Sequence, residues 1–344
     1  MTVRVGIIGA SGYTGAELMR VCAQHPDFEL CYATGDTQAG TLASSLYPSV
    51  TAKYPDLVFE EFDLARTVGL DLVFLGLPHE ASMALAPQLV GRVGCVVDLS
   101  AAYRLKDASL YPTWYGFEHD QPELLAQSVL GLPELYRAQL RGATLVATPG
   151  CHVTAAALAL EPLVAAGLVE RSGLIVDSIT GISGAGRSLK NGSLFCSVDE
   201  DLQAYGLLDH RHTPEMEQFI GGAEGGCQIL FTPHLAPLNR AILATCYARP
   251  TGSTTTERLL ATLASRYRDE PFVVVRPTSP STKAALGTNT SFLTARYDER
   301  TNTVISICAI DNLCKGASGG AVQAANVALG LDETAGLQQI GLYP

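Results

Sequence analysis

The sequence lacks the surplus of basic residues that nucleic-acid-binding proteins carry. It contains 23 Lys and Arg against 34 Asp and Glu, which gives a formal net charge of −11, and it has no Lys/Arg block. Because phosphate backbones are bound mainly by clustered cations, this composition excludes a nucleic-acid partner. Charged residues make up only 17 % of the chain, where about 25 % is usual, which indicates a surface partly covered by other subunits.

Long apolar runs and paired cysteine motifs are also missing. The most apolar stretch, residues 154–168, is broken by Glu161 and Pro162, so we expect no membrane-spanning segment. A strand predicted at residues 3–8 leaves no room for a signal peptide. The nine cysteines form no C-x-x-C pair, which favours a reducing, cytoplasmic location and argues against a disulfide scaffold or a bound metal.

The first half of the sequence alternates apolar runs with helical patterns. Strands are predicted at residues 3–8, 28–33, 70–77 and 94–99, with helices at 14–23 and 82–90. Such β–α alternation predicts an α/β domain with a doubly wound, Rossmann-type parallel sheet. Beyond a helix at 152–166, alternating segments at 228–231, 241–248, 272–276, 290–295 and 304–310 predict a mainly antiparallel sheet. We expect a dinucleotide-binding domain over 1–149, to which a C-terminal helical segment (about 313–344) returns, and an α+β catalytic and oligomerisation domain over 150–312.

A glycine-rich turn follows the first predicted strand and opens the first helix. Such glycines let backbone N–H groups approach a pyrophosphate at the positive end of a helix. The spacing is G-x-x-G-x-x-G rather than G-x-G-x-x-G, and a structural turn is the alternative, but the place at the first βα junction favours dinucleotide binding. The candidate residues are Gly9, Ser11, Gly12, Tyr13, Thr14 and Gly15.

The second predicted strand ends near Gly35 and Asp36. An acidic residue there often accepts a hydrogen bond from the ribose 2′-hydroxyl of NAD, whereas a basic residue favours the 2′-phosphate of NADP. No Lys or Arg lies between Arg20 and Lys53. Since Asp36 is equally well explained as a solvated turn residue, the local chemistry leaves the choice between NAD and NADP open.

Cys151 stands at the predicted start of a helix, after Pro149 and Gly150. The positive end of a helix dipole stabilises a thiolate, which is a good nucleophile toward acyl carbons. Taken alone, such a cysteine is explained equally well by core packing.

A thiolate catalyst also needs an acid/base partner. The segment His210-Arg211-His212 offers two imidazoles without metal-ligand spacing, and either fits the role. His152 follows Cys151 directly, but we expect its side chain to point elsewhere.

Two further segments have the composition of ligand sites. Ser183-Gly184-Ala185-Gly186-Arg187 is a glycine-rich loop that ends in a guanidinium, and Arg104 follows a predicted buried strand. Arginine matches carboxylate and phosphate oxygens, although a surface ion pair is the ordinary alternative for each.

Together these motifs resemble the N-acetyl-γ-glutamyl-phosphate reductase family of the aspartate-semialdehyde dehydrogenase-like superfamily. The resemblance spans the whole chain in order and spacing, and its most specific parts are Pro149-Gly150-Cys151 and the string from His210 to Glu215. The other segments that carry it are the glycine turn, Leu77-Pro78-His79, Asp98-Leu99-Ser100, residues 183–187, residues 231–234 and Asp311-Asn312-Leu313 with Lys315-Gly316.

The resemblance implies NADPH-dependent reduction of N-acetyl-γ-glutamyl phosphate to the semialdehyde, the third step of arginine biosynthesis. In this implied mechanism Cys151 forms a thioester, phosphate leaves, and hydride converts the thioester to the aldehyde. It also implies a homo-oligomer, a dimer or a tetramer. The implied roles are proton transfer by His212 with support from His210, substrate binding by Arg104, Arg187, His210 and Arg211, and cofactor contacts by Ser183, Gly184 and Asn312.

The sequence departs from the family pattern at several positions. Thr148 replaces the usual Asn, His152-Val153 replaces Tyr-Pro, and Ala102-Tyr103 replaces Asp-Phe. Gly35-Asp36-Thr37 replaces a polar or basic run after the second strand, so NAD is not excluded.

Three other functions remain open from the sequence. A sister enzyme of lysine biosynthesis through aminoadipate shares these motifs, but its acidic carrier protein calls for a basic rim that this chain lacks. Aspartate-semialdehyde dehydrogenase lacks the string from His210 to Glu215. A catalytically silent dinucleotide sensor has no need of Cys151 and His212 together.

Overall fold

The computed structural model describes residues 2–222 and 225–343, which form two compact units. Unit 1 comprises Met1–Pro149 and Ala317–Leu337, and unit 2 comprises Gly150–Gly316 and Gln338–Pro344. The C-terminal segment is therefore divided between the units. The sequence had assigned about 313–344 as a whole to the first domain.

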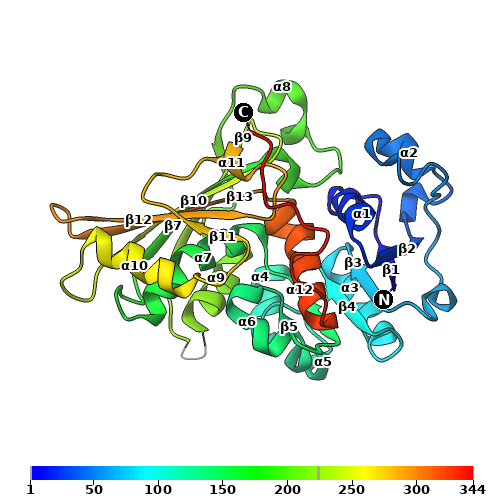
Figure 1. Ribbon diagram of the computed structural model, residues 1–344, viewed down its shortest axis with the longest axis horizontal. Helices are drawn as coiled ribbons and strands as arrows, with labels where there is room; N and C mark the ends of the chain where they lie inside the picture. Colours follow the sequence, from blue (N-terminus) through cyan, green and yellow to red (C-terminus); the bar gives the residue numbers. More distant parts are fainter. Residues whose placement is uncertain (1, 223–224, 344) are drawn as a thin grey trace. The chain divides into compact units, whose positions relative to one another are not determined.

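Unit 1 is built on a six-stranded sheet in the order β2-β1-β3-β4-β6-β5, in which all neighbouring strands are parallel (Figure 1). This confirms the predicted Rossmann-type sheet. Its strands are β1 (Val3–Ile8), β2 (Phe28–Ala33), β3 (Leu72–Leu75), β4 (Cys95–Asp98), β5 (Val129–Leu130) and β6 (Leu145–Ala147). Its α-helices are α1 (Tyr13–Gln24), α2 (Ala43–Leu46), α3 (His79–Leu89), α4 (Tyr111–Tyr115), α5 (Pro122–Gln127), α6 (Pro133–Leu140) and α12 (Gly319–Leu329).

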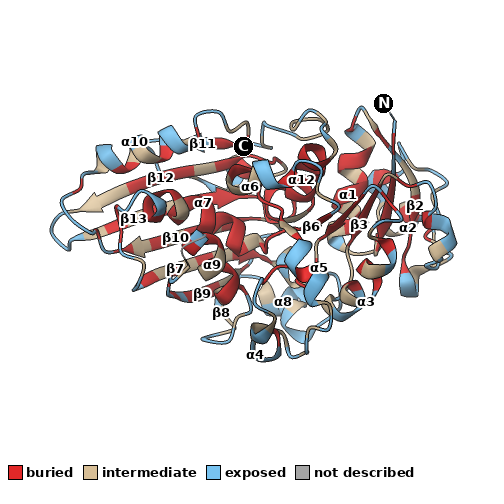
Figure 2. Cartoon of the chain, turned by 90° about the horizontal axis from the view of Figure 1, so that it is seen from below, coloured by how far each residue is buried: buried red, intermediate tan, exposed pale blue. Residues whose placement is uncertain are grey.

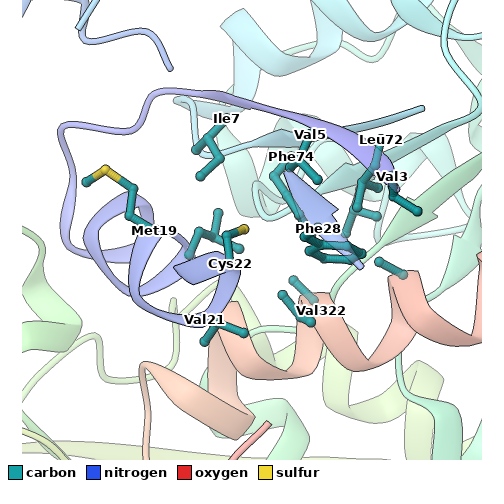
Figure 3. Packing of buried hydrophobic residues seen from close by; sticks show 14 of the residues in the cluster. Val3, Val5, Ile7, Met19, Val21, Cys22, Phe28, Leu72, Phe74 and Val322 are labelled. Atoms are coloured by element: carbon teal, nitrogen blue, oxygen red, sulfur yellow. The ribbon is translucent and has the colours of Figure 1, made fainter. Parts of the chain in front are cut away.

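Strand β3 is apolar at every position because both of its faces are buried. All four of its residues are buried: Leu72 and Phe74 pack on one face of the sheet, and Val73 and Leu75 on the other. The first face is covered by α1 and by α12, and Figure 3 shows Val322 of α12 facing Phe28 of β2. A sheet buried on both faces has no position for an alternating polar residue.

Unit 2 contains a mixed seven-stranded sheet in the order β11-β12-β13-β10-β7-β9-β8. The pairs β11–β12 and β7–β9 are parallel and the others antiparallel, which confirms the expected mainly antiparallel sheet. Its strands are β7 (Leu174–Gly181), β8 (Gln203–Ala204), β9 (Ile229–Ala236), β10 (Ile242–Ala248), β11 (Val273–Val275), β12 (Ser291–Asp298) and β13 (Thr303–Ile310). Its α-helices are α7 (Cys151–Ala165), α8 (Phe195–Val198), α9 (His212–Gly221), α10 (Thr256–Arg266) and α11 (Thr282–Ala285).

Helix α7 is the central element of unit 2. It is buried over most of its length (Figure 2), and its backbone is tied to its neighbours by side chains. Tyr267 donates to the carbonyl of Leu158 at 2.8 Å, and Ser306 of β13 donates to the carbonyl of Ala159 at 2.8 Å. These contacts fix the helix that begins at Cys151.

The other face of this sheet is apolar but only partly buried. Residues along β7, β10 and β13 alternate between buried positions, on the α7 side, and half-exposed positions on the open side. The strand register aligns the half-exposed positions into rows across the sheet. One row is Leu230, Ile175, Tyr247 and Ile305, and a second contains Ile179 and Leu243.

Strand β7 and helix α10 are among the longest elements that the sequence analysis missed. Strand β7 alternates buried and half-exposed residues over Leu174–Gly181, but Asp177 and Ser178 interrupt its apolar pattern. Among the described residues, no helix is long and apolar enough to span a bilayer.

Candidate active site

The glycine turn of unit 1 has the geometry of a phosphate site. Gly9 adopts φ +90°, and a Cβ there would lie 2.5 Å from the carbonyl oxygen of Gly76. A Cβ on Gly12, the N-cap of α1, would meet only the carbonyl oxygen of Gly9, at 3.8 Å, which is an ordinary contact. No side chain caps this 12-residue helix, so its first N–H groups remain available to an anion. The turn therefore fits a pyrophosphate.

The end of β2 is joined to this turn by hydrogen bonds. The N–H of Gly9 donates to Oγ1 of Thr34 at 3.1 Å, and Ser11 donates through Oγ to the carbonyl of Gly35 at 3.1 Å. Asp36 follows in an exposed 3₁₀ turn. Tyr13 is also exposed, whereas Thr14 accepts a hydrogen bond through its carbonyl from Ser318 at 2.8 Å. The predicted cofactor residues of unit 1 are thus brought together.

Cys151 is the first residue of α7 and is partly exposed. Its N-cap, Gly150, provides no side chain, and Gly316 packs so closely that a Cβ on Gly316 would lie 2.9 Å from Cβ of Cys151. Two residues without side chains thus leave the thiol accessible at the positive end of a 15-residue helix.

His212 lies directly against the start of α7. A Cβ on Gly150 would be 2.3 Å from Nε2 of His212, so only glycine fits beside this ring. The N–H of Gly150 donates to Oε1 of Glu215 at 2.6 Å, and Glu215 is fully buried one turn along α9 from His212. The hydrogen bond from Gly150 to Glu215 holds the starts of the two helices together.

Three imidazoles gather at this point. The ring centroids of His210 and His212 are 4.7 Å apart, and that of His152 lies 5.9 and 5.7 Å from them. His152 bonds through Nδ1 to Oγ of Ser178 (2.7 Å) and through Nε2 to the hydroxyl of Tyr205 (3.1 Å). The expectation that His152 points elsewhere is therefore wrong, because the segment containing His210 and His212 folds around the side of α7 where His152 lies.

Two of these imidazoles are held neutral. Burial lowers the pKa of His152 to about 3, with a further contribution from His210. Burial, followed by the nearby Arg211 cation, lowers the pKa of His210 to about 4. Nδ1 of His210 accepts the N–H of His212 at 3.1 Å, which also requires an unprotonated nitrogen there. Among residues 2–222 and 225–343, no group of His, Cys, Asp or Glu has metal-binding geometry.

A second cluster in unit 2 joins Ser183, Gly184 and Asn312. Asn312 accepts the N–H of Ala241 at 2.8 Å and donates to Oγ of Ser183 at 2.9 Å. A Cβ on Gly184 would lie 4.0 Å from Nδ2 of Asn312. These three predicted cofactor residues are therefore neighbours within unit 2.

The predicted arginines occupy different surroundings. Arg104, in unit 1, is 7 % exposed and donates through Nη2 to the carbonyl of Leu99 at 2.9 Å. Arg211 is exposed immediately before α9, beside the imidazole cluster. Arg187 is exposed in the loop after Gly186.

The sequence analysis assigned no role to Glu215, Tyr205 or Gly316. Glu215 and Gly316 belong to motifs that it quoted, and a buried acid three residues after His212 on a helix was the available signal. The sequence offered no signal for Tyr205, because its contact with His152 joins positions that are 53 residues apart.

Two family models match the chain. Residues 4–143 match the semialdehyde dehydrogenase NAD binding domain, and residues 151–312 match the semialdehyde dehydrogenase dimerisation domain. Solved structures share the fold at low identity. They include aspartate semialdehyde dehydrogenase from Candida albicans with NADP (16 % identity, 95 % of this chain and 98 % of that chain, TM-score 0.71) and aspartate semialdehyde dehydrogenase II from Vibrio cholerae (15 %, 95 % and 98 %, TM-score 0.71).

Curated relatives are much more similar. The N-acetyl-γ-glutamyl-phosphate reductase of Symbiobacterium thermophilum is 45 % identical, with 100 % of both chains covered. That of Desulforudis audaxviator is 46 % identical over 99 % of this chain and 100 % of its own. Full-length identity at this level shows that the chain belongs to the N-acetyl-γ-glutamyl-phosphate reductase family, within the semialdehyde dehydrogenases.

Proposed function

We propose that the chain reduces N-acetyl-γ-glutamyl phosphate to N-acetylglutamate semialdehyde with release of phosphate, the reaction that arginine biosynthesis requires. The observation that carries this proposal is Cys151, partly exposed at the start of a buried helix, with the ring of His212 packed against the preceding Gly150. This arrangement supports the assignment of Cys151 as the nucleophile and of His212 as its acid/base partner.

In the first half of the reaction, the thiolate of Cys151 attacks the acyl carbon of the substrate. A carbon–sulfur bond forms, the carbon–oxygen bond to phosphate breaks, and phosphate departs with the bonding electron pair. The N-terminal dipole of α7 supports the thiolate, and the thiol is partly exposed beside two residues, Gly150 and Gly316, that have no side chains.

In the second half, the thioester carbon must receive a hydride, which is one proton with two electrons. Bound NAD(P)H would supply it. The resulting tetrahedral thiohemiacetal then collapses to the aldehyde and returns the thiolate to Cys151. We assign proton transfer in these steps to His212, because His210 is held neutral by burial and its Nδ1 already accepts the N–H of His212.

Anionic groups of the substrate require cations. Arg211 is the cation beside the imidazole cluster, and its proximity contributes to the lowered pKa of His210. Within unit 2, we assign the substrate phosphate and carboxylate to Arg211 and Arg187, with His210 as a polar neighbour. Arg104, in unit 1, stays a predicted substrate-binding residue.

Unit 1 binds the dinucleotide through the glycine turn, where Gly9, Ser11, Gly12 and Gly15 bring backbone N–H groups to the end of α1. In unit 2, Ser183, Gly184 and Asn312 form a polar cluster that we propose as a further set of cofactor contacts. The family resemblance implies NADPH, but Asp36, at the end of β2, bears directly on that choice.

We further propose that two copies of the chain associate through the open face of the unit 2 sheet. Its rows of half-exposed apolar residues, including Ile175, Tyr247 and Ile305, form an apolar surface, and the matching family model is described as a dimerisation domain. Light scattering of the Ile305→Glu variant is expected to show a smaller oligomer than the unaltered protein.

The experiment that tests the function runs the reaction in reverse. Purified protein is mixed with N-acetylglutamate semialdehyde, phosphate and an oxidised dinucleotide, and reduced dinucleotide is followed at 340 nm. We expect turnover that requires phosphate and that falls with the aldehyde one carbon longer. Turnover only with the longer aldehyde, or none with either, would overturn the proposal.

A further inference from the structure

The cofactor preference of this chain depends on the segment that ends β2. Thr34 and Gly35 are fixed to the glycine turn by three hydrogen bonds: Gly9 N–H to Oγ1 of Thr34, Ala10 N–H to the carbonyl of Thr34 at 2.7 Å, and Ser11 Oγ to the carbonyl of Gly35. Asp36 therefore follows directly from a segment whose position is set by the phosphate-binding turn. In a Rossmann-type sheet, this is where the adenosine ribose is recognised.

Asp36 is exposed and carries a charge that the protein does not neutralise. Its side chain makes no hydrogen bond or ion pair with another described residue. Its backbone adopts φ +45°, a left-handed conformation that few residues other than glycine, Asn and Asp populate. An exposed carboxylate without a partner among the described residues is available to a ligand, and its left-handed backbone is one that aspartate adopts more readily than most residues.

The same segment contains no cation that would offset this charge. No Lys or Arg occurs between Arg20 and Lys53. Arg20 is paired with the buried carboxylate of Glu17 at 2.5 Å, and Arg66, farther along the chain, is paired with Glu60 at 2.8 Å. Both guanidinium groups thus already have carboxylate partners.

We propose that Asp36 recognises the free ribose 2′-hydroxyl and makes NADH the preferred dinucleotide of this enzyme. A hydroxyl donates to an ionised carboxylate, which can only accept, whereas a 2′-phosphate offers acceptors and about −1.5 to −2 charges. The proposal rests on dinucleotide binding by unit 1, and it departs from the NADPH that the family resemblance implies.

The test is direct binding, independent of turnover. Dissociation constants for NADH and NADPH are measured by titration calorimetry on the unaltered protein, on Asp36→Ser and on Asp56→Ser. Asp56 is a matched control, because it is also an exposed aspartate of unit 1 without a bonded partner among the described residues. Each titration is repeated at low and high salt.

We expect NADH to bind the unaltered protein about tenfold more tightly than NADPH, since like charges a few ångströms apart in solvent repel by about the energy of a tenfold change in affinity. Asp36→Ser should tighten NADPH and weaken NADH, whereas Asp56→Ser should leave their ratio unchanged. Salt should narrow the preference in the unaltered protein, because it screens the repulsion.

Tighter binding of NADPH by the unaltered protein, or a ratio that Asp36→Ser leaves unchanged, would overturn the inference. Failure to bind either dinucleotide would overturn the proposed function and this inference together. Normal NADH preference without turnover of the acyl phosphate would contradict only the proposed function.

Discussion

The sheets of the two units differ in how their faces are covered. In unit 1, all strands are parallel, and strands such as β3 are apolar at every position because both faces are buried. In unit 2, strands such as β10 alternate buried and half-exposed residues, so one face packs on α7 while the other stays open. A covered sheet leaves its ligand chemistry to the strand ends and loops, whereas a half-open sheet also keeps a face for a second copy.

The chemistry divides in the same way. Unit 1 offers mainly backbone N–H groups and a free carboxylate, which suits recognition of a dinucleotide. Unit 2 brings a thiol, three imidazoles and a buried acid to the start of one helix, which suits bond making and breaking. Binding and chemistry should therefore respond separately to substitutions in the two units.

Replacing the nucleophile should separate catalysis from dinucleotide binding most strongly. Cys151→Ser is expected to lower kcat by about 10⁴-fold or more, because a hydroxyl is a far weaker nucleophile than a thiolate. Calorimetry should show NAD(P)H affinity unchanged. Cys196→Ser, an exposed cysteine on α8, and Cys31→Ser serve as controls with nearly full activity. Retained turnover in Cys151→Ser would contradict the assignment.

Substitutions of the imidazoles should have the next largest effect on kcat. His212→Ala is expected to reduce kcat by about 10²–10⁴-fold, the usual range for loss of a general acid/base, and His210→Ala by much less. Rapid-quench measurement of the enzyme thioester should show it accumulating in His212→Ala. The opposite ranking of the two variants would transfer the proton-transfer role to His210.

A single methyl group on Gly150 should disturb the site by displacing the ring of His212. In Gly150→Ala the new Cβ would fall 2.3 Å from Nε2 of His212, so the ring must move, and we expect about a 10²-fold loss of kcat. Gly192→Ala is the matched control in unit 2, because its Cβ would meet nothing within 4 Å. Equal kcat values for the two variants would show that the ring position is unimportant.

The matching change in unit 1 should affect binding alone. A Cβ on Gly12 fits sterically but projects into the space where a pyrophosphate would lie, so Gly12→Ala should weaken dinucleotide binding by about tenfold, with Tm changed by no more than about 2 °C. Gly9→Ala should instead destabilise the fold, because φ +90° and the carbonyl of Gly76 exclude a side chain. Unchanged affinity in Gly12→Ala would argue against the turn as the phosphate site.

The smallest expected effect is the pH dependence of folding stability. The pKa values of His152 and His210 in the folded protein, about 3 and about 4, lie below the ordinary 6.5, so the unfolded chain binds more protons in mild acid. The free energy of unfolding is therefore highest, with respect to these rings, above pH 6.5. It falls as the pH drops toward 4, and we expect a loss of about 1–2 kcal/mol per ring between pH 7 and pH 5. Urea unfolding at both pH values measures it. His152→Gln should show a weaker pH dependence, and an equally steep one would contradict the neutral state of His152.

Much of this arrangement could be predicted from the sequence. The sequence predicted well the features that depend on residues close together in the chain. These are the apolar strands, the glycine turn at the start of α1 and the cysteine at a helix start. Strand β7 was missed because Asp177 and Ser178 break its pattern, and their places are set by neighbouring strands. Tyr205 and His152 meet only through the folding of distant segments, which no spacing rule encodes.

The candidate active site shows the same limit of prediction from sequence. The ring of His212 packs against Gly150 at the start of α7, and the N–H of His212 donates to Nδ1 of His210. These two contacts distinguish the two imidazoles. Two imidazoles one residue apart cannot be ranked by sequence pattern alone. The roles of Arg104, Arg187 and Arg211 remain predictions for the same reason.

The division of the chain between the units also affects the order of folding during synthesis. Helix α12, from residues 319–329, supplies Val322 to the same core as Val3 and Phe28 of the first strands. A nascent chain therefore leaves the part of this apolar sheet face that α12 covers exposed until nearly all of unit 2 has left the ribosome. We expect unit 2 to be able to complete most of its fold first, and unit 1, although begun earlier, to depend on chaperone protection until its last helix arrives.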